Sequence, residues 1–256
     1  MTYKTIRLDV ADFIAVVTID NPPVNAQNSQ FRNEMMHAFD SFNDRDDVRV
    51  AILTGTGNMF SAGADMKERP SRDDPGAYWA HARRVRESAN SIRECFKPVI
   101  CAVNGPALGA GAGIMAACDI IIASDNATIG MPEIDVGLAG GAAMLQRLVG
   151  NSTGRLMFFT GRRLPAAELY RQGAISAVVP REKLMDEAMG IAREIASKSP
   201  TGIRYAKLSY NTTSTMPQRD GYRFEQNATH TLSFTEDAQE AQAAFREKRK
   251  PNFKGK

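Results

Sequence analysis

The chain has 256 residues, of which 43% are hydrophobic and 24% charged, and its formal net charge at pH 7 is +3. This is the composition of an ordinary soluble protein, long enough for one large domain with a well-buried core and short for two. So small a net charge does not by itself indicate a nucleic-acid binder, and no stretch approaches the roughly 18 apolar residues of a membrane span.

Basic residues are concentrated at the C-terminal end, where REKRKPNFKGK carries six of them against one acid. This tail is either a solvated end or a surface for an anionic group such as a phosphate-bearing ligand. Cys95, Cys101 and Cys118 have neither metal-type spacing nor an even count, which predicts buried thiols in a reducing compartment, by default the cytoplasm. We expect no targeting segment, because residues 1–13 lack a long apolar run.

The predicted elements begin with strands and continue with helices between them. In chain order we predict strands at 5–10 and 13–20, a helix at 28–43, a strand at 49–55, a long helix at 76–96, and strands at 97–105 and 118–125. The strands are rich in β-branched residues, and the polar Ala-Asp pair after the first strand suits a hairpin. The run of isoleucines at 120–122 indicates a strand that is covered on both faces.

The second half of the chain is mostly helical. We predict helices at 141–150, 152–161 and 165–173, a short strand at 175–180, a helix at 183–199, and three further helical stretches between 201 and 249. Early strands with interleaved helices, followed by helices alone, indicate an α/β core with an appended helical region.

Five small residues, 109–113, interrupt an apolar segment where a strand passes into a helix. Glycine and alanine at such a junction let the backbone turn sharply and expose the unpaired N–H groups of the first helical turn. The glycine spacing fits neither a P-loop nor a dinucleotide fingerprint. A second small-residue corner, FSAGAD at 60–65, also follows a strand. Two corners predict two N–H donors converging on one oxygen, although close packing of a helix on a sheet would account for either alone.

The motifs FSAGADMKE, KPVICAVNGPALGAGAGIMAACDIIIAS, IGMPEIDVGL, LQRLVG and EKRKPNF resemble those of the crotonase superfamily, the enoyl-CoA hydratase/isomerase family. The resemblance covers nearly the whole chain and weakens only across 69–85, a region that varies with the acyl substrate in this family. It implies an α/β fold with a spiral of ββα units over residues 1–195. A C-terminal helical region over 196–256 would then build trimers, often paired into hexamers.

The resemblance also implies an oxyanion hole made of two backbone amides, those of Ala64 and Ala110. Ala110 stands where the family usually has glycine, but its peptide N–H is retained. The hole is needed because removing a proton next to a thioester carbonyl produces an enolate. The residues expected to contact the substrate beside these amides are Ala62, Asp65, Met66, Gly109 and Gly141.

Hydratases of this family usually have two glutamates, one that activates water and one that handles the α-proton. Glu133 matches the second, whereas Gly113 occupies the position of the first. A single glutamate resembles the family's Δ3,Δ2-enoyl-CoA isomerases. Asp135 is a candidate partner, since in an extended segment it would project from the same face about 7 Å further on; otherwise it is a solvated or ion-paired carboxylate. Gly141 stands where dienoyl-CoA isomerases have an aspartate, which argues against that activity.

The variable region contributes further candidates. His81 either supplies the missing acid or base, given its near-neutral pKa, or is a surface histidine. Tyr78 and Trp79, with Met66, either line an acyl pocket or pack against a neighbouring helix.

The basic tail acquires a candidate role from the same resemblance. Coenzyme A carries phosphates at its adenosine end, and basic residues near the C-terminus, sometimes from an adjacent subunit, lie beside them in this family. The positions concerned are Lys248, Lys250 and Phe253.

The sequence therefore predicts an enzyme that acts on an acyl-CoA thioester, with coenzyme A as part of the substrate and neither a separate cofactor nor a metal. Hydration or dehydration of an enoyl-CoA is the first candidate reaction, double-bond isomerisation the second, and a hydrolase, decarboxylase or ring-opening reaction the third. A catalytically weak acyl-CoA-binding or RNA-binding protein is the alternative from another class. The slightly acidic body of the chain counts against an RNA surface.

Overall fold

The computed structural model describes residues 2–71 and 73–256. Strands β1 (Ile6–Ala11) and β2 (Ile14–Ile19) form the predicted antiparallel hairpin. Its turn residues are Asp12 and Phe13, one position later than the expected Ala-Asp pair, and both have positive φ, 51° and 65°. Two left-handed residues between two strands are typical of the turn that matches the natural strand twist.

The central sheet has six strands in the order β1-β2-β4-β6-β8-β11. Beyond β2 the ladder continues in parallel through β4 (Val50–Gly55), β6 (Val99–Val103), β8 (Ile120–Ser124) and β11 (Ala177–Val179). In β8, Ile121 packs into the cluster on one face of the sheet and Ile122 into the cluster on the other. The prediction of a strand covered on both faces is confirmed, because alternate side chains of a strand point to opposite faces.

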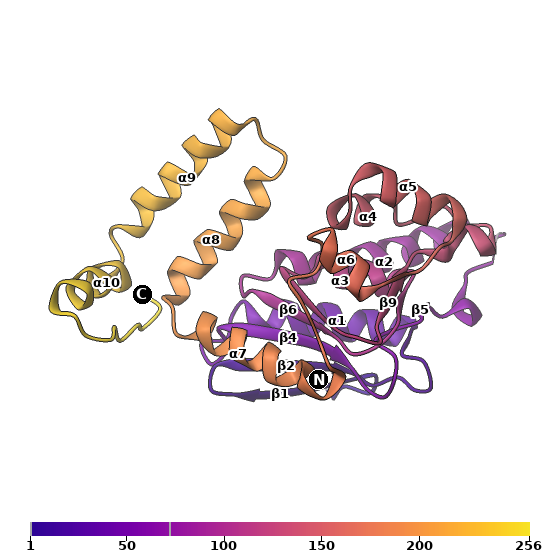
Figure 1. Cartoon of the computed structure of the whole chain (residues 1–256), viewed down its shortest axis with the longest axis horizontal. Helices are drawn as coiled ribbons and strands as arrows, with labels where there is room; N and C mark the ends of the chain where they lie inside the picture. The colour runs from indigo at the N-terminus through magenta and orange to yellow at the C-terminus, as the bar shows by residue number, and fades with distance from the viewer. Residues whose placement is uncertain (1, 72) are drawn as a thin grey trace.

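Strands β2, β4, β6 and β8 are each followed by a very short strand and then a helix. The short strands are β3 (Ala26–Gln27), β5 (Gly63–Ala64), β7 (Ala107–Leu108) and β9 (Thr128–Gly130), and the helices are α1 (Ser29–Phe42), α2 (Pro75–Glu94), α3 (Ala110–Ala117) and α4 (Ala142–Leu148). The short strands pair with one another, β3 with β5 and β7 with β9, and β9 also pairs with β10 (Leu164–Pro165). This repeat confirms the predicted spiral of ββα units (Figure 1).

Helix starts follow the local sequence. Asn28 caps α1 by accepting a hydrogen bond from the Phe31 amide, and Asp74 caps α2 by accepting one from Ala77. Side-chain oxygens at these positions satisfy amides that have no partner inside the helix. Helix α2 ends at Glu94, two residues before the predicted end, and the Phe96 amide instead donates to the Asn43 side chain at 2.7 Å.

Helix α7 (Leu184–Ala196) covers the second face of the central sheet with Leu184, Ala188 and Ala192. Helices α8 (Pro200–Thr213), α9 (Gln218–Leu232) and α10 (Glu236–Glu247) then extend away from the sheet, with α9 lying beside α8 (Figure 1). The chain leaves the sheet at the turn after Ala196. The division into residues 1–195 and 196–256 stays a prediction.

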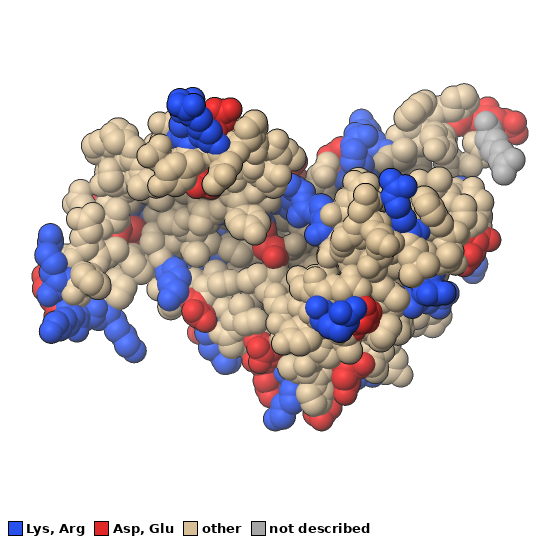
Figure 2. Space-filling model, turned by 45° about the horizontal axis from the view of Figure 1, so that its top comes forward, with Lys and Arg blue, Asp and Glu red and all other residues tan. Residues whose placement is uncertain are grey.

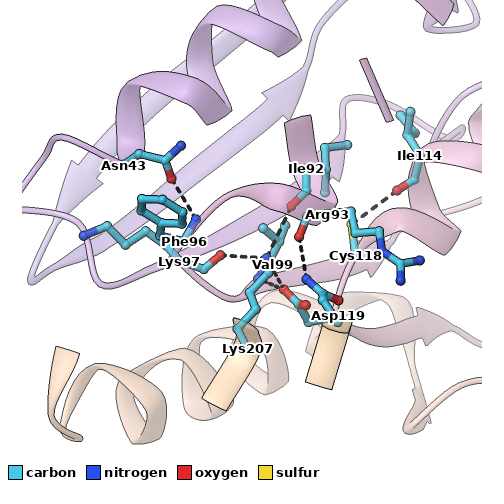
Figure 3. Close-up of polar contacts among 11 residues, drawn as sticks. Asn43, Ile92, Arg93, Phe96, Lys97, Val99, Ile114, Cys118, Asp119 and Lys207 are labelled. Atoms are coloured by element: carbon cyan, nitrogen blue, oxygen red, sulfur yellow. Dashed lines mark hydrogen bonds and ion pairs between the residues drawn. The ribbon is translucent and has the colours of Figure 1, made fainter. Parts of the chain in front are cut away.

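Lys207 attaches this C-terminal region to the spiral core (Figure 3). Its ammonium group lies 2.8 Å from the Asp119 carboxylate and also donates to the carbonyl oxygens of Lys97 and Ile92. Asp119 accepts a second hydrogen bond, from the Val99 amide at 2.7 Å. Lys207 is the buried residue of α8. Asn211, one turn further on, donates to the Arg93 carbonyl at 2.9 Å, so two hydrogen-bonded side chains hold this helix against the core.

Two further features agree with the sequence. Cys95, Cys101 and Cys118 are free thiols and buried, as predicted. Within residues 2–71 and 73–256, no helix is both long and apolar enough to cross a membrane. Acidic and basic side chains are interspersed over the face in Figure 2, and basic ones gather at the end where α10 and the C-terminus lie.

Candidate active site

The first small-residue corner ends in strand β5. Gln27 of β3 is the register partner of Ala64, and the Asp65 amide donates to the Gln27 carbonyl at 3.1 Å. Successive amides of a strand point to opposite sides, so the Ala64 N–H faces away from β3. Gly63 has φ 94°, and a Cβ atom there would lie 3.1 Å from the Ala110 nitrogen. The two corners predicted from the sequence are therefore adjacent.

The second corner is the start of α3. Gly109 precedes the helix with φ 54° and ψ −124°, and the first hydrogen bond closing the helix runs from the Gly113 amide to the Gly109 carbonyl at 3.0 Å. Ala110 precedes Gly113 in the first turn of α3. Its amide is therefore one of the N–H donors that a helix leaves unpaired at its positive end. It lies next to the Gly63–Ala64 strand. The sharing of one acceptor oxygen by the two amides stays a prediction.

The glycines of this segment have different structural reasons. Gly109 adopts a left-handed φ, and a side chain at Gly111 would overlap the Ser61 carbonyl oxygen, so α3 approaches the first corner closely there. The backbone turn at Gly109 and the close approach at Gly111 serve the packing of α3 against the first corner as well as any binding of a ligand. A Cβ atom at Gly113 would meet nothing within 4 Å, although the residue is buried. The position that lacks the second glutamate thus faces open space.

Glu133 lies at the start of a 3-10 turn, Pro132–Val136, and not in an extended segment. Its Oε1 atom would be 3.0 Å from a Cβ atom at Gly109, so the carboxyl group lies against the turn that presents the Ala110 amide. Among the residues that the structure describes, its buried Oε2 atom has no hydrogen-bond partner. Burial raises the pKa of Glu133. A partly buried carboxyl group without a partner is typical of an acid or base held ready for a substrate.

Asp135 does not accompany Glu133. Its carboxylate is exposed and lies 2.8 Å from where a Cβ atom of Gly161 would be, after α5 (Asn151–Thr160). The premise of an extended segment is wrong, because successive residues of the tight turn point in different directions around its axis. Gly141 has φ 100°, and a side chain there would overlap the Met131 sulfur atom. This position cannot accept the aspartate of a dienoyl-CoA isomerase without rearrangement.

Ala62 and Asp65 of the first corner are half-buried, and the residues from Met66 to Arg69 that follow it are exposed. The Ala62 amide donates to the Val24 carbonyl at 3.0 Å, and Asp65 caps a short turn, η1 (Met66–Glu68), by accepting from the Lys67 amide. Met66 is 48% exposed. Tyr78 and Trp79 are also exposed and pack edge to face against each other. The acyl-pocket role expected for these side chains stays a prediction.

His81 belongs to α2 and faces α1, with its Nδ1 atom 3.5 Å from Nη1 of Arg32. Burial and the neighbouring positive charges, first that of Arg32, lower the pKa of His81. A neutral imidazole that faces a guanidinium group is an acceptor there and a poor general acid.

The basic tail lies far from Glu133 in the same chain. The end of α10 and the C-terminus lie on the opposite side of the molecule from α3, β5 and β9 (Figure 1). The Phe253 carbonyl accepts a hydrogen bond from Arg49 at 3.1 Å, and Lys248 ends α10 with φ 54°. The contact of Lys248, Lys250 and Phe253 with the ligand stays a prediction.

The model of the enoyl-CoA hydratase/isomerase family matches residues 9–256 of the chain. The chain belongs to this family of enzymes. A probable enoyl-CoA hydratase of Mycobacterium tuberculosis (strain CDC 1551 / Oshkosh) is 36% identical over 257 residues, which cover 99% of either chain. A hydrolase of Rhodococcus jostii (strain RHA1) that acts on (7aS)-7a-methyl-1,5-dioxo-2,3,5,6,7,7a-hexahydro-1H-indene-carboxyl-CoA is 38% identical over 240 residues, 94% of this chain and 93% of that protein.

A carnitinyl-CoA dehydratase of Citrobacter koseri is 36% identical over 251 residues, 95% of each chain. Among solved structures, an enoyl-CoA hydratase from Bacillus anthracis has a TM-score of 0.92 at 32% identity, covering 99% of this chain and all of that one. The relatives of this chain thus include hydratases, a dehydratase and a hydrolase. Family membership alone does not select one reaction.

Two further observations concern residues that bind metals and a buried arginine near the site. Among residues 2–71 and 73–256, no group of three or more His, Cys, Asp or Glu side chains could hold a metal ion. Arg32, by contrast, is only 1% exposed and lies close to the first corner. The sequence does contain a signal for it, because Arg32 falls three residues before Met35 and seven before Phe39, within the apolar stripe of α1.

Proposed function

We propose that this enzyme catalyses the reversible addition of water to an enoyl-CoA thioester, with Glu133 as its proton carrier. The observation that carries the proposal is the buried, unpartnered carboxyl oxygen of Glu133 beside the turn that presents the Ala110 amide. The hydratase and dehydratase names of its relatives support the same reaction.

The two backbone amides would hold the thioester oxygen. As hydroxide adds to C3 of the enoyl group, the electrons of the double bond move toward the carbonyl, and negative charge develops on that oxygen. The Ala64 and Ala110 N–H groups, the second at the positive end of α3, stabilise the charge. Removing one such donor in comparable sites costs about 3–4 kcal/mol of transition-state stabilisation.

Glu133 would move one proton in each direction. As a carboxylate it takes a proton from water while the hydroxide forms the bond to C3, and as a carboxylic acid it delivers that proton to C2 of the enolate. Dehydration is the reverse, and in both directions Glu133 begins the cycle ionised. The open space at Gly113, where other hydratases use a second glutamate, leaves room for a water molecule.

Double-bond isomerisation is the second candidate, and Gly113 favours it. A single carboxylate can remove a proton from C2 of a 3-enoyl-CoA and return it to C4, with the same two amides stabilising the dienolate. This reaction needs no activated water. It would therefore be unaffected by the absence of a carboxylate at position 113.

One assay separates these reactions. The purified protein is incubated in D2O with crotonyl-CoA and, separately, with 3-hexenoyl-CoA, and the conjugated thioester absorbance and product mass are followed. Water added to crotonyl-CoA supports hydration, whereas migration of the 3-hexenoyl double bond without hydration supports the isomerase. Free coenzyme A would indicate a hydrolase, and no reaction of either substrate would contradict both proposals for monocarboxylic acyl groups.

We also propose that the C-terminal helices pack against other copies of the chain. Helix α9 buries only Gly221, while Tyr210 and Tyr222 on α8 and α9 are 83% and 62% exposed. A trimer, as the family resemblance implies, would cover such side chains and bring a second tail toward the site. Sedimentation equilibrium tests this, and a mass of 28.0 kDa, that of one chain, at micromolar concentration would contradict it.

A further inference from the structure

Arg32 is a buried arginine with two unused hydrogen-bond donors. It lies in the second turn of α1 and is 1% exposed, and its Nε and Nη2 atoms have no partner among the residues that the structure describes. Its Nη1 atom makes one long contact, 3.5 Å to Nδ1 of His81. An arginine stays charged in proteins, and a buried charge without a partner destabilises the fold. Such a group is expected to serve a ligand.

The two unused nitrogens are the pair with which arginine holds a carboxylate. Arg45 uses Nε and Nη2 to bind both oxygens of Asp47, at 2.8 and 2.6 Å. Arg171 binds both oxygens of Glu168 through the same pair, again at 2.8 and 2.6 Å. This parallel geometry is the strong, bidentate form of the arginine–carboxylate pair. In Arg32 the same pair is open.

The nearby carboxylates of the chain are engaged elsewhere. Glu68 accepts a hydrogen bond from the Ser29 amide at 2.6 Å, and Asp65 accepts one from the Lys67 amide at 2.9 Å. Their charges act on Arg32 without contacting its open pair. Arg69 and Arg84 add positive charge to the same neighbourhood. The surroundings of Arg32 thus favour an anion.

Arg32 lies near the end of the first corner of the active site, because the charges of Asp65 and Glu68 act on it and Glu68 binds the first amide of α1. Gln27 pairs with Ala64, and α1 begins two residues after Gln27. Strands lie about 4.8 Å apart, and a helix rises about 1.5 Å per residue. The Arg32 backbone is therefore on the order of 10 Å from the Ala64 amide. A group held by both would extend several bonds beyond the thioester.

The elements that border Arg32 are lightly packed. Helix α2, which carries His81, buries Ser88, Ala89, Ser91 and Ile92 in its second half, and the first half has no residue classed as buried among those described. The turn η1 has no buried residue either. Segments with few buried contacts open at low free-energy cost. We therefore expect the first half of α2 to open more readily than its second half and so admit a ligand to Arg32.

We propose that Arg32 binds a carboxylate at the far end of the acyl group, so that the enzyme takes acyl-CoAs of dicarboxylic acids. The inference rests on the proposed function only for the placement of the thioester at Ala64 and Ala110. It does not depend on which reaction follows.

Calorimetric binding tests it with saturated acyl-CoAs, which have no double bond to hydrate. Succinyl-, glutaryl-, adipyl- and pimelyl-CoA are each compared with the methyl ester of the distal carboxyl group, and butyryl-CoA serves as the reference. At least one diacid should bind ten-fold or more tightly than its ester. Arg32→Met should bring the pair within two-fold of each other and leave butyryl-CoA affinity unchanged within two-fold.

The matched control is Arg83→Met, which removes an exposed arginine from α2 and should keep the preference for the diacid. Arg32→Lys retains the charge but lacks the paired nitrogens, so it should lose most of the preference for the diacid. This variant provides the test if Arg32→Met does not fold. Equal affinity for diacid and ester at every length, or a preference that survives in Arg32→Met, would overturn the inference. A clear diacid preference alongside no hydration of the 2-enoyl-CoA of that same diacid would overturn only the proposed reaction.

Discussion

Placing a glutamate at position 113 should convert the single-carboxylate site into one with two. Gly113 lies inside α3, and a Cβ atom there would meet nothing within 4 Å. Because φ at this position is not in the left-handed region, the substitution needs no backbone change. Replacing an interior helical glycine by a good helix former also contributes up to about 1 kcal/mol to helix stability.

The expected gain in rate follows from acid–base catalysis. A positioned carboxylate contributes typically 10²–10⁴-fold. An added side chain without supporting contacts should stay at or below the lower limit of that range, about 10-fold to 10²-fold in kcat for hydration of crotonyl-CoA. A second carboxylate near Glu133 would also raise the apparent pKa values of the pair, so the acid limb of the pH–rate profile should move upward.

The assay is the loss of conjugated thioester absorbance across pH 5 to 9 for wild type, Gly113→Glu and Gly113→Gln. The glutamine variant has the same shape without the charge and should show no gain. Gly111→Glu is a structural control, because a side chain there would overlap Ser61 and should lower the melting temperature. If Gly113→Glu folds, binds butyryl-CoA and hydrates no faster than Gly113→Gln, then a missing carboxylate does not limit this enzyme.

Three further predictions follow from the buried groups. Glu133→Gln should lower kcat at least 10³-fold with acyl-CoA affinity retained, measured by turnover and calorimetry; an unchanged rate would exclude Glu133 from the mechanism. Burial raises the pKa of Glu133 above its ordinary 4.5, so its ionised form costs folding stability above that pH. Glu133→Gln should therefore melt higher than wild type at pH 7, with a difference that shrinks toward pH 4, and a constant difference would contradict this. Lys207→Met should lower the free energy of unfolding by about 3 kcal/mol, the low end for a broken buried pair because the Asp119 side chain is 24% exposed. Adding Asp119→Asn should restore part of that loss in urea unfolding.

The family and the main elements could be read from the sequence because their signals are local. The β-branched strand at 118–125, the Asn28 cap and the apolar spacing of α1 each depend on residues a few positions apart. The two small-residue corners and the Pro-Glu motif were visible as patterns. Glu133 and the departure at Gly113 were predicted from the family resemblance, which also depends on order and spacing along the chain.

Only the tertiary structure decided what these patterns do together. The two-residue strands β3, β5 and β7 have no signal of their own, since they exist through pairing with distant segments. That pairing brings Gly63 against Ala110 and Gly109 against Glu133, turns Asp135 outward and leaves the tail on the opposite side. The open nitrogens of Arg32 are likewise a property of its neighbours. Periodicity and capping act over one or two turns of chain, whereas burial, pKa and unpaired donors depend on contacts between residues far apart in the sequence.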